Sequence, residues 1–164
     1  PAAATALLMA VQEAQVWCDK DENKEEMCKI LGTRAWFNVP VPDILPRAKG
    51  EIDYGLPGKK VTASPHRMKF WRDNASFPWR SHEQWFLTEQ IRWGKLETST
   101  DVGALIGRVN RADLWRAAAK ALGVAADAIP EGDSRGKETF FDGKVFDPAN
   151  PAAYLASLDI KRVA

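Results

Sequence analysis

Apolar residues recur with a helical period along much of the chain, and glycine or proline marks where each such stretch ends. The first stretch covers residues 2–18, and the second follows the cap candidates Asp19 and Asp21 and stops at Gly32. One face of the first stretch carries Leu7, Val11, Ala14 and Cys18. The pattern therefore predicts two N-terminal helices joined by a short polar turn.

The next part of the chain, residues 39–65, is interrupted by prolines and glycines. The interrupting residues are Pro40, Pro42, Pro46, Pro57, Pro65, Gly50, Gly55 and Gly58. Because proline breaks both helices and central strands, only a brief helix at residues 42–49 is expected there. The segment is predicted to be a long connection that wraps a surface.

Three further helices are predicted between residues 80 and 122. Ser81 followed by Gln84 has the pattern of a capping box, and the helix that it opens is expected to end at Gly94. Another helix should start near Asp101, and a third should run from the cap residue Asn110 through an apolar stripe that ends at Leu122.

The strongest turn signal of the chain is Asp142-Gly143, which stands between two pairs of strand-forming residues. It predicts one short β-hairpin. A last helix is expected to begin at Pro151, with Tyr154 and Leu158 facing inward. The residues alone therefore predict a mainly α chain with one short β-hairpin, no larger sheet and no compelling internal domain boundary.

Composition limits the possible functions. The chain has 164 residues, 45% of them hydrophobic, which is enough to build a substantial core. Its formal net charge of +1 does not favour nucleic-acid binding, since that requires a basic excess. The apolar run at residues 2–10 is too short to span a bilayer and lacks the flanks of a signal peptide. Full helical periodicity from the first residues suggests a chain that begins within a helix.

Two cysteines, Cys18 and Cys28, are too few for a disulfide scaffold and lack the spacing partners of a zinc site. If two antiparallel helices meet near Asp21, a bridge between them is possible but strained. Buried free thiols are the alternative, and the sequence favours it.

Residues 68–94 hold four of the seven tryptophans together with many charged residues. Aromatic residues at helical spacing are typical of a core, and Asp73, Glu83 and Glu89 interrupt any surface on which bases might stack. His66 and His82 are accompanied by no nucleophile elbow, metal-ligand spacing or phosphate-binding loop. The sequence thus predicts no catalytic residue, metal site or cofactor, and an enzyme is the least supported class.

Four stretches, taken in order, are similar to one family. They are "LLMAVQEAQVWCDKDENKEEMCKIL", "MKFWRDNASFPWRSHEQWFLTEQIRWG", "VNRADLWRAAAKALGV" and "SRGKETFFDGKVFDPANPAAYLASLDIK". They resemble the C-terminal part of the nitrate-binding proteins of nitrate ABC transporters, and the bicarbonate-binding proteins are relatives. The resemblance covers residues 2–161.

This resemblance implies that residues 1–164 are the C-terminal portion of a two-lobed α/β fold of the periplasmic-binding-protein type II class, which closes on a small anion. The N-terminal part, which in the family supplies the first lobe and most ligand contacts, would lie outside this chain. Lys69 in "RMKFW" matches a family lysine that contacts the anion. Such a charge is physically reasonable, because a buried nitrate needs a compensating cation and directional donors.

The function implied by the resemblance is the substrate-binding component of an ABC transporter for nitrate or nitrite uptake. It would work in the periplasm or on the outer face of the inner membrane, with ABC permease subunits as partners. The alternative is a cytoplasmic nitrate sensor that binds a partner protein or controls a transporter ATPase. Nitrate, nitrite and bicarbonate cannot be told apart from Lys69 alone.

The resemblance also predicts how the isolated chain behaves. The apolar stripes of residues 2–18 and 110–122, together with Phe140, Phe141 and Phe146, would in the family cover the missing lobes. Without those lobes the chain is expected to self-associate or to remain bound to the N-terminal part of the same protein, and to bind nitrate negligibly alone.

Overall fold

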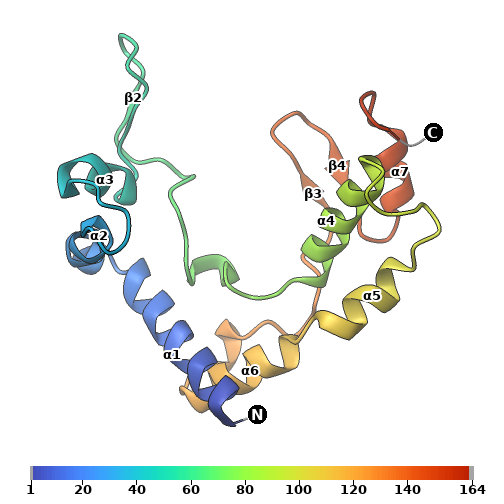
Figure 1. Cartoon of the computed structure of the whole chain (residues 1–164), viewed down its shortest axis with the longest axis horizontal. Helices are drawn as coiled ribbons and strands as arrows, with labels where there is room; N and C mark the ends of the chain where they lie inside the picture. The colour runs from blue at the N-terminus through green and yellow to red at the C-terminus, as the bar shows by residue number, and fades with distance from the viewer. Residues whose placement is uncertain (1, 163–164) are drawn as a thin grey trace. The chain divides into compact units, whose positions relative to one another are not determined.

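The computed structural model describes residues 2–162, and helices make up most of their regular structure (Figure 1). Within these residues no helix combines the length and the apolar character needed to cross a membrane. The elements are α1 (Ala2–Asp19), α2 (Lys24–Gly32), α3 (Val41–Ala48), β1 (Ile52–Asp53), β2 (Lys60–Val61), α4 (Arg80–Arg92), α5 (Val102–Val109), α6 (Ala112–Ala121), β3 (Glu138–Thr139), β4 (Val145–Phe146) and α7 (Pro151–Ala156).

The chain divides into two compact units. The N-terminal unit is Pro1–Ser76 and holds α1 to α3 and the β1–β2 hairpin. The C-terminal unit is Phe77–Ala164 and holds α4 to α7 and the β3–β4 hairpin. The mainly α character of both units agrees with the prediction from the sequence.

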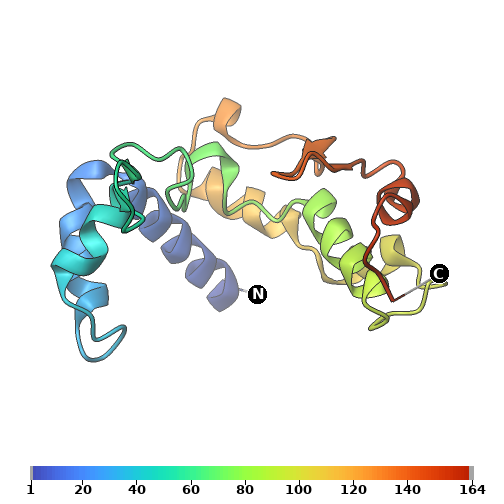
Figure 2. The same ribbon diagram turned by 90° about the horizontal axis from the view of Figure 1, so that it is seen from above.

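In the N-terminal unit α2 and α3 lie side by side (Figures 1 and 2). They approach closely at Gly32, where a Cβ atom would stand 2.7 Å from the carbonyl oxygen of Val39. No side chain fits there without a shift of the backbone. The predicted apolar face of α1 is not covered within the described residues, since Leu7 is 67% exposed.

A second hairpin, β1–β2, was not predicted. Ile52 pairs with Val61 and Asp53 with Lys60, so each strand has only two residues and leaves no periodic pattern. The turn is fixed locally, because the Asp53 carboxylate accepts a hydrogen bond from the N–H of Gly55 at 2.8 Å. The prediction of a single hairpin is therefore wrong, because the described residues form two. The prediction that no larger sheet is present holds for these residues.

The C-terminal unit has an apolar core around Phe77. The Trp115 ring of α6 meets the Phe77 ring edge-on, with centroids 5.1 Å apart. The Arg116 guanidinium covers the Phe77 ring, with its central carbon 4.8 Å from the centroid. Trp115 is 4% exposed, and Ala118 one turn further along α6 is fully buried, which agrees with the predicted stripe of this helix.

The β3–β4 hairpin packs beside α4 and α7 (Figure 1). Trp85 of α4 donates a hydrogen bond to the hydroxyl of Tyr154 at 3.2 Å, and that hydroxyl donates to the Glu89 carboxylate at 3.0 Å. Burial of this phenol raises the pKa of Tyr154. Phe146 is 2% exposed and belongs to this cluster, and Phe140 packs against it. The expectation that both rings would lack a partner without the missing lobes is therefore wrong, because the hairpin folds onto its own unit.

The predicted capping box is also wrong. The N-cap of α4 is Trp79, and no side chain caps the helix there. The Ser81 hydroxyl instead accepts a hydrogen bond from the N–H of Arg135 at 3.1 Å, and the Gln84 amide donates to the carbonyl of Pro148 at 3.0 Å. Both side chains are used for contacts with distant parts of the chain.

Two other predicted helix starts are confirmed, one of them with its predicted cap. Asp101 is the N-cap of α5 and accepts a hydrogen bond from the N–H of Ala104 at 2.9 Å. Helix α6 begins near the predicted position, but its N-cap is Arg111 and not the predicted Asn110, whose side-chain oxygen accepts a bond from the N–H of Ala112 at 3.1 Å.

Candidate functional site

Lys69 lies in the segment that closes the N-terminal unit, here called the lysine segment (residues 67–74). Its ammonium forms an ion pair with the carboxylate of Asp73 within the same segment. The side chains of Lys69 and Asp73 are 38% and 62% exposed. The cationic group predicted to contact an anion is therefore accessible, with a carboxylate already beside it.

The backbone of the lysine segment is held by Asp19, the last residue of α1. The Asp19 carboxylate accepts hydrogen bonds from three consecutive N–H groups, those of Phe70 at 3.0 Å, Trp71 at 2.7 Å and Arg72 at 2.7 Å. The Arg72 guanidinium adds a further contact, with its Nε 3.5 Å from the carboxylate. Successive N–H groups that converge on one anion form a backbone nest, here filled by a side chain of the protein itself.

A buried lysine completes the arrangement. The Asp19 carboxylate, the N–H groups of residues 70–72 that it binds and the Lys24 ammonium are together called the Asp19 anchor. Lys24 of α2 is 1% exposed, and its Nζ lies 3.9 Å from the Asp19 carboxylate. The same ammonium donates a hydrogen bond to the carbonyl of Cys18 at 2.5 Å and stands 5.5 Å from the centre of the Phe70 ring. The two charges compensate each other in a site where either alone would be costly to bury.

The titration of these groups follows from their surroundings. Burial by itself would raise the pKa of Asp19, but the N–H groups of Arg72, Trp71 and Phe70 and the Arg72 charge outweigh it and lower that pKa. Burial raises the pKa of the Cys18 and Cys28 thiols, and the Lys24 charge opposes this only in part. Both cysteines are free, so of the two alternatives that the sequence left open the structure has the free thiols.

Backbone strain gathers at the end of the lysine segment. Asp73 and Asn74 have φ values of 56° and 55°, a left-handed conformation that residues with a side chain seldom adopt. Two such residues in a row persist only where the surrounding structure holds them. They follow directly after the three residues whose N–H groups bind Asp19.

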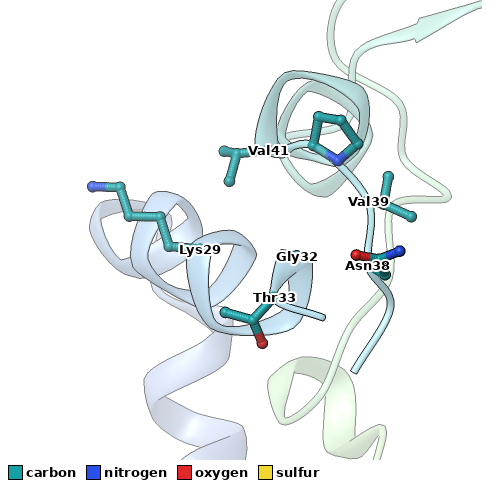
Figure 3. Close-up of a pocket in the computed structure, with 7 residues that line it drawn as sticks. Lys29, Gly32, Thr33, Asn38, Val39 and Val41 are labelled. Carbon is teal, nitrogen blue, oxygen red and sulfur yellow. The ribbon is translucent and has the colours of Figure 1, made fainter. Parts of the chain in front are cut away.

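The described part of the N-terminal unit includes two cavities of similar size. One, of about 360 Å³, is lined mainly by apolar side chains, with Lys24 and Phe70 on its wall. The other, of about 420 Å³, lies where α2 ends and α3 begins, and Figure 3 shows the Lys29 side chain directed away from Thr33 and Asn38. Lys29 is paired with Glu25 at 2.9 Å and is 55% exposed, so this cavity does not present a free cation to an anion.

The two histidines lie in different units. His82 of α4 contacts the Glu138 carboxylate of β3 at 2.8 Å and lines an aromatic cavity of about 280 Å³ in the C-terminal unit. His66 donates its backbone N–H to the hydroxyl of Ser64 at 3.1 Å. Among the described residues, no group of three or more His, Cys, Asp or Glu residues is arranged to hold a metal ion.

The sequence did not identify Asp19 and Lys24 as parts of the site. Asp19 was taken for a helix cap, and its partners lie 51 to 53 residues further along the chain, beyond the reach of any local pattern. Lys24 belongs to a run of charged residues, "DKDENKEE", which is typical of a solvated surface. Only its burial distinguishes it.

Comparison with known proteins gives a consistent group of relatives, although no family model matches the chain. Over 163 residues, 99% of this chain, it is 60% identical to the nitrate/nitrite binding protein NrtA of Nostoc sp.. It is 47% identical to the bicarbonate-binding protein CmpA of Synechococcus elongatus over 169 residues, again 99% of this chain. Similarity to the nitrate import ATP-binding protein NrtC of Synechocystis is lower, 30% over 99% of this chain and 23% of the relative.

The fold has a close counterpart among solved structures. The crystal structure of the periplasmic nitrate-binding protein NrtA from Synechocystis matches with a TM-score of 0.92 at 60% identity. The match covers 96% of this chain and 41% of that one. The chain spans only 37% of the Nostoc relative and 38% of the Synechococcus one, so each relative has a large part with no counterpart here.

Proposed function

The chain belongs to the family of nitrate/nitrite-binding proteins, and from that premise we propose that it is a segment of the substrate-binding component of an ABC transporter. In the complete protein, a two-lobed α/β fold would bind nitrate or a related small oxyanion between its lobes. Residues 1–164 would be the C-terminal portion of that fold. The observation that carries the proposal is the 60% identity to a nitrate/nitrite binding protein over almost the whole chain.

The proposed partners follow from the same premise. They are the oxyanion, the permease subunits of the transporter and the remaining part of the same protein, and the place of action is the periplasm or the outer face of the inner membrane. The exposed apolar face of α1, with Leu7 and Val11 at 67% and 43%, supports a contact with that remaining part. The role is binding, and no enzymatic step is proposed.

Within this segment we assign the anion contact to Lys69. Its ammonium is accessible and belongs to a segment whose backbone is fixed by the Asp19 anchor. A nitrate ion has few atoms with which to gain affinity, so charge-assisted hydrogen bonds from a held cation matter more than apolar contact. The anion would compete with Asp73 for the Lys69 ammonium.

A control domain on a transporter ATPase, or a cytoplasmic nitrate sensor, is the alternative function. The 30% identity to the ATP-binding protein NrtC favours it. The identity to the binding proteins is twice as high, which is why the substrate-binding role comes first. Fractionation of the cells that make the complete protein separates the two, because capture requires the periplasm and sensing requires the cytoplasm.

The test of the Lys69 assignment is calorimetric titration of nitrate into the complete protein and its Lys69→Ala variant. Loss of one charge-assisted contact to a buried anion costs about 1.5 to 3 kcal/mol, so affinity should fall at least about tenfold. Lys29→Ala is the matched control, because Lys29 also has a carboxylate partner four residues away in the same unit. Equal affinities of wild type and Lys69→Ala, with the fold intact, would remove Lys69 from the site.

A further inference from the structure

Asp19 occupies a position where a carboxylate destabilises the helix to which it belongs. It is the last residue of α1, and the C-terminal end of a helix carries partial negative charge that disfavours an anion. It is also 8% exposed, so it has lost most of its hydration. Neither helix stability nor solubility explains an acid here, and its contacts must supply the reason.

Those contacts are directed at one short piece of backbone. Both carboxylate oxygens are used, Oδ1 by the N–H of Phe70 and Oδ2 by those of Trp71 and Arg72. Three successive peptide units are thereby fixed relative to the end of α1. Phe70 directly follows Lys69, so the anchor begins at the peptide bond next to the proposed anion-binding residue.

Lys24 keeps the Asp19 carboxylate charged and in place. The Lys24 ammonium lies 3.9 Å from it, and because Lys24 is 1% exposed this pair is shielded from the salt and water that weaken surface pairs. Lys24 also binds the Cys18 carbonyl at 2.5 Å, which satisfies an acceptor at the end of α1. The anchor thus ties α1, α2 and the lysine segment together.

The conformation after the anchor depends on it as well. Asp73, the partner of Lys69, has a φ of 56° and comes directly after Arg72, the last anchored residue. Release of the anchor frees the strained residues to relax, and the Lys69–Asp73 arrangement changes with them. An anion-binding group loses much of its benefit when its position is off by even about 1 Å.

We propose that Asp19 is a positioning residue for anion binding, which acts by fixing the backbone of residues 70–72 so that the Lys69 ammonium is held where the anion binds. Asp19 itself does not touch the anion, since its oxygens are occupied by the nest. The inference rests on the proposed function of the chain and adds to it a residue outside the binding site.

The test is a double-mutant cycle in the complete protein, with nitrate affinity measured for wild type, Asp19→Asn, Lys69→Ala and the double variant. If Asp19 acts through Lys69, Asp19→Asn weakens nitrate binding at least about fivefold when Lys69 is present, and less than about twofold when it is alanine. A merely structural role gives the same fold-loss in both backgrounds, and that result overturns the inference. Asp21→Asn is the matched control: among the described residues the Asp21 carboxylate pairs with the Arg67 side chain, at 2.8 Å, rather than with the backbone next to Lys69, so its loss should leave affinity unchanged.

Two further measurements keep the result decisive. If Asp19→Asn does not fold, Asp19→Glu keeps the charge and displaces the carboxylate by one methylene group; severalfold weaker binding by this folded variant supports the inference, and unchanged binding overturns it. A wild-type protein that does not bind nitrate overturns the proposed function and the inference with it. Nitrate binding that depends on Lys69, together with an additive cycle, overturns the inference alone.

Discussion

The two units differ in what their interiors are made of. Among the described residues, the N-terminal unit contributes only Met27 and Cys28 to the buried hydrophobic residues, and it buries Gln12, Asp19, Lys24 and Ser64 beside them. The C-terminal unit buries eleven hydrophobic residues, from Phe77 to Leu158. One unit is organised around a buried charge pair and the other around an apolar core.

This difference suggests that the C-terminal unit mainly contributes stability and the N-terminal unit mainly contributes to binding. Apolar packing is non-directional and tolerates small displacements, so it suits a unit that serves as a support. A buried carboxylate with three hydrogen bonds fixes geometry but must first give up its hydration, and such costs are expected near functional groups. The unit with the sparse apolar core is the one that carries Lys69.

The largest expected effect tests the apolar core. Trp115→Ala removes a side chain that is 4% exposed and stacked edge-on against Phe77, so the C-terminal unit should lose about 3 to 5 kcal/mol. Native-state hydrogen exchange of the α6 amides measures this loss. Phe141→Ala is the control, because Phe141 is fully exposed and its removal should change stability by less than about 0.5 kcal/mol. A loss below about 1 kcal/mol for Trp115→Ala would contradict the picture of a packed core.

Acid should act more strongly on the N-terminal unit. The pKa of Asp19 is lowered on folding, so its stabilisation is complete above the ordinary value of 3.8 and is lost as the pH falls through the lowered value. In the C-terminal unit, Arg111 lowers the pKa of Asp113 to about 2, but this pair is exposed and contributes little to stability. The amides of Phe70, Trp71 and Arg72 should therefore lose more of their hydrogen-exchange protection in acid than the α6 amides do. The prediction fails if α6 loses more protection, or if Asp19→Asn leaves the acid response of residues 70–72 unchanged.

The sequence correctly predicted the turns and helix ends that depend on residues close together in the chain. The Asp142-Gly143 hairpin, the Asp101 cap and the Pro151 helix all rest on turn and capping chemistry within a few residues, and all three are present. The capping box at Ser81 failed because a distant backbone N–H, that of Arg135, took the hydroxyl. Propensity within a short window cannot decide between a local and a distant partner.

The candidate site shows the same limit more strongly. Lys69 came from family resemblance, because nothing in its local pattern distinguishes it from a surface lysine. Its anchor depends on Asp19, which is far from it in the chain, and on the burial of Lys24, which its charged neighbours conceal. The β1–β2 hairpin was missed for a different reason, since strands of two residues carry no periodicity.

The smallest expected effect compares one exposed ion pair from each unit. Asp73 holds the Lys69 ammonium, and an exposed pair of this kind contributes about 0 to 1 kcal/mol. An anion must displace Asp73 to reach Lys69, so Asp73→Asn should tighten nitrate binding by up to about fivefold, and most at low salt, where the competing pair is strongest. Asp113→Asn removes the exposed partner of Arg111 in the C-terminal unit and should leave nitrate affinity unchanged. Calorimetry at two salt concentrations measures both variants. Weaker binding by Asp73→Asn would mean that Asp73 orients Lys69 for the anion, and the N-terminal unit would then have a second positioning carboxylate in place of a competitor.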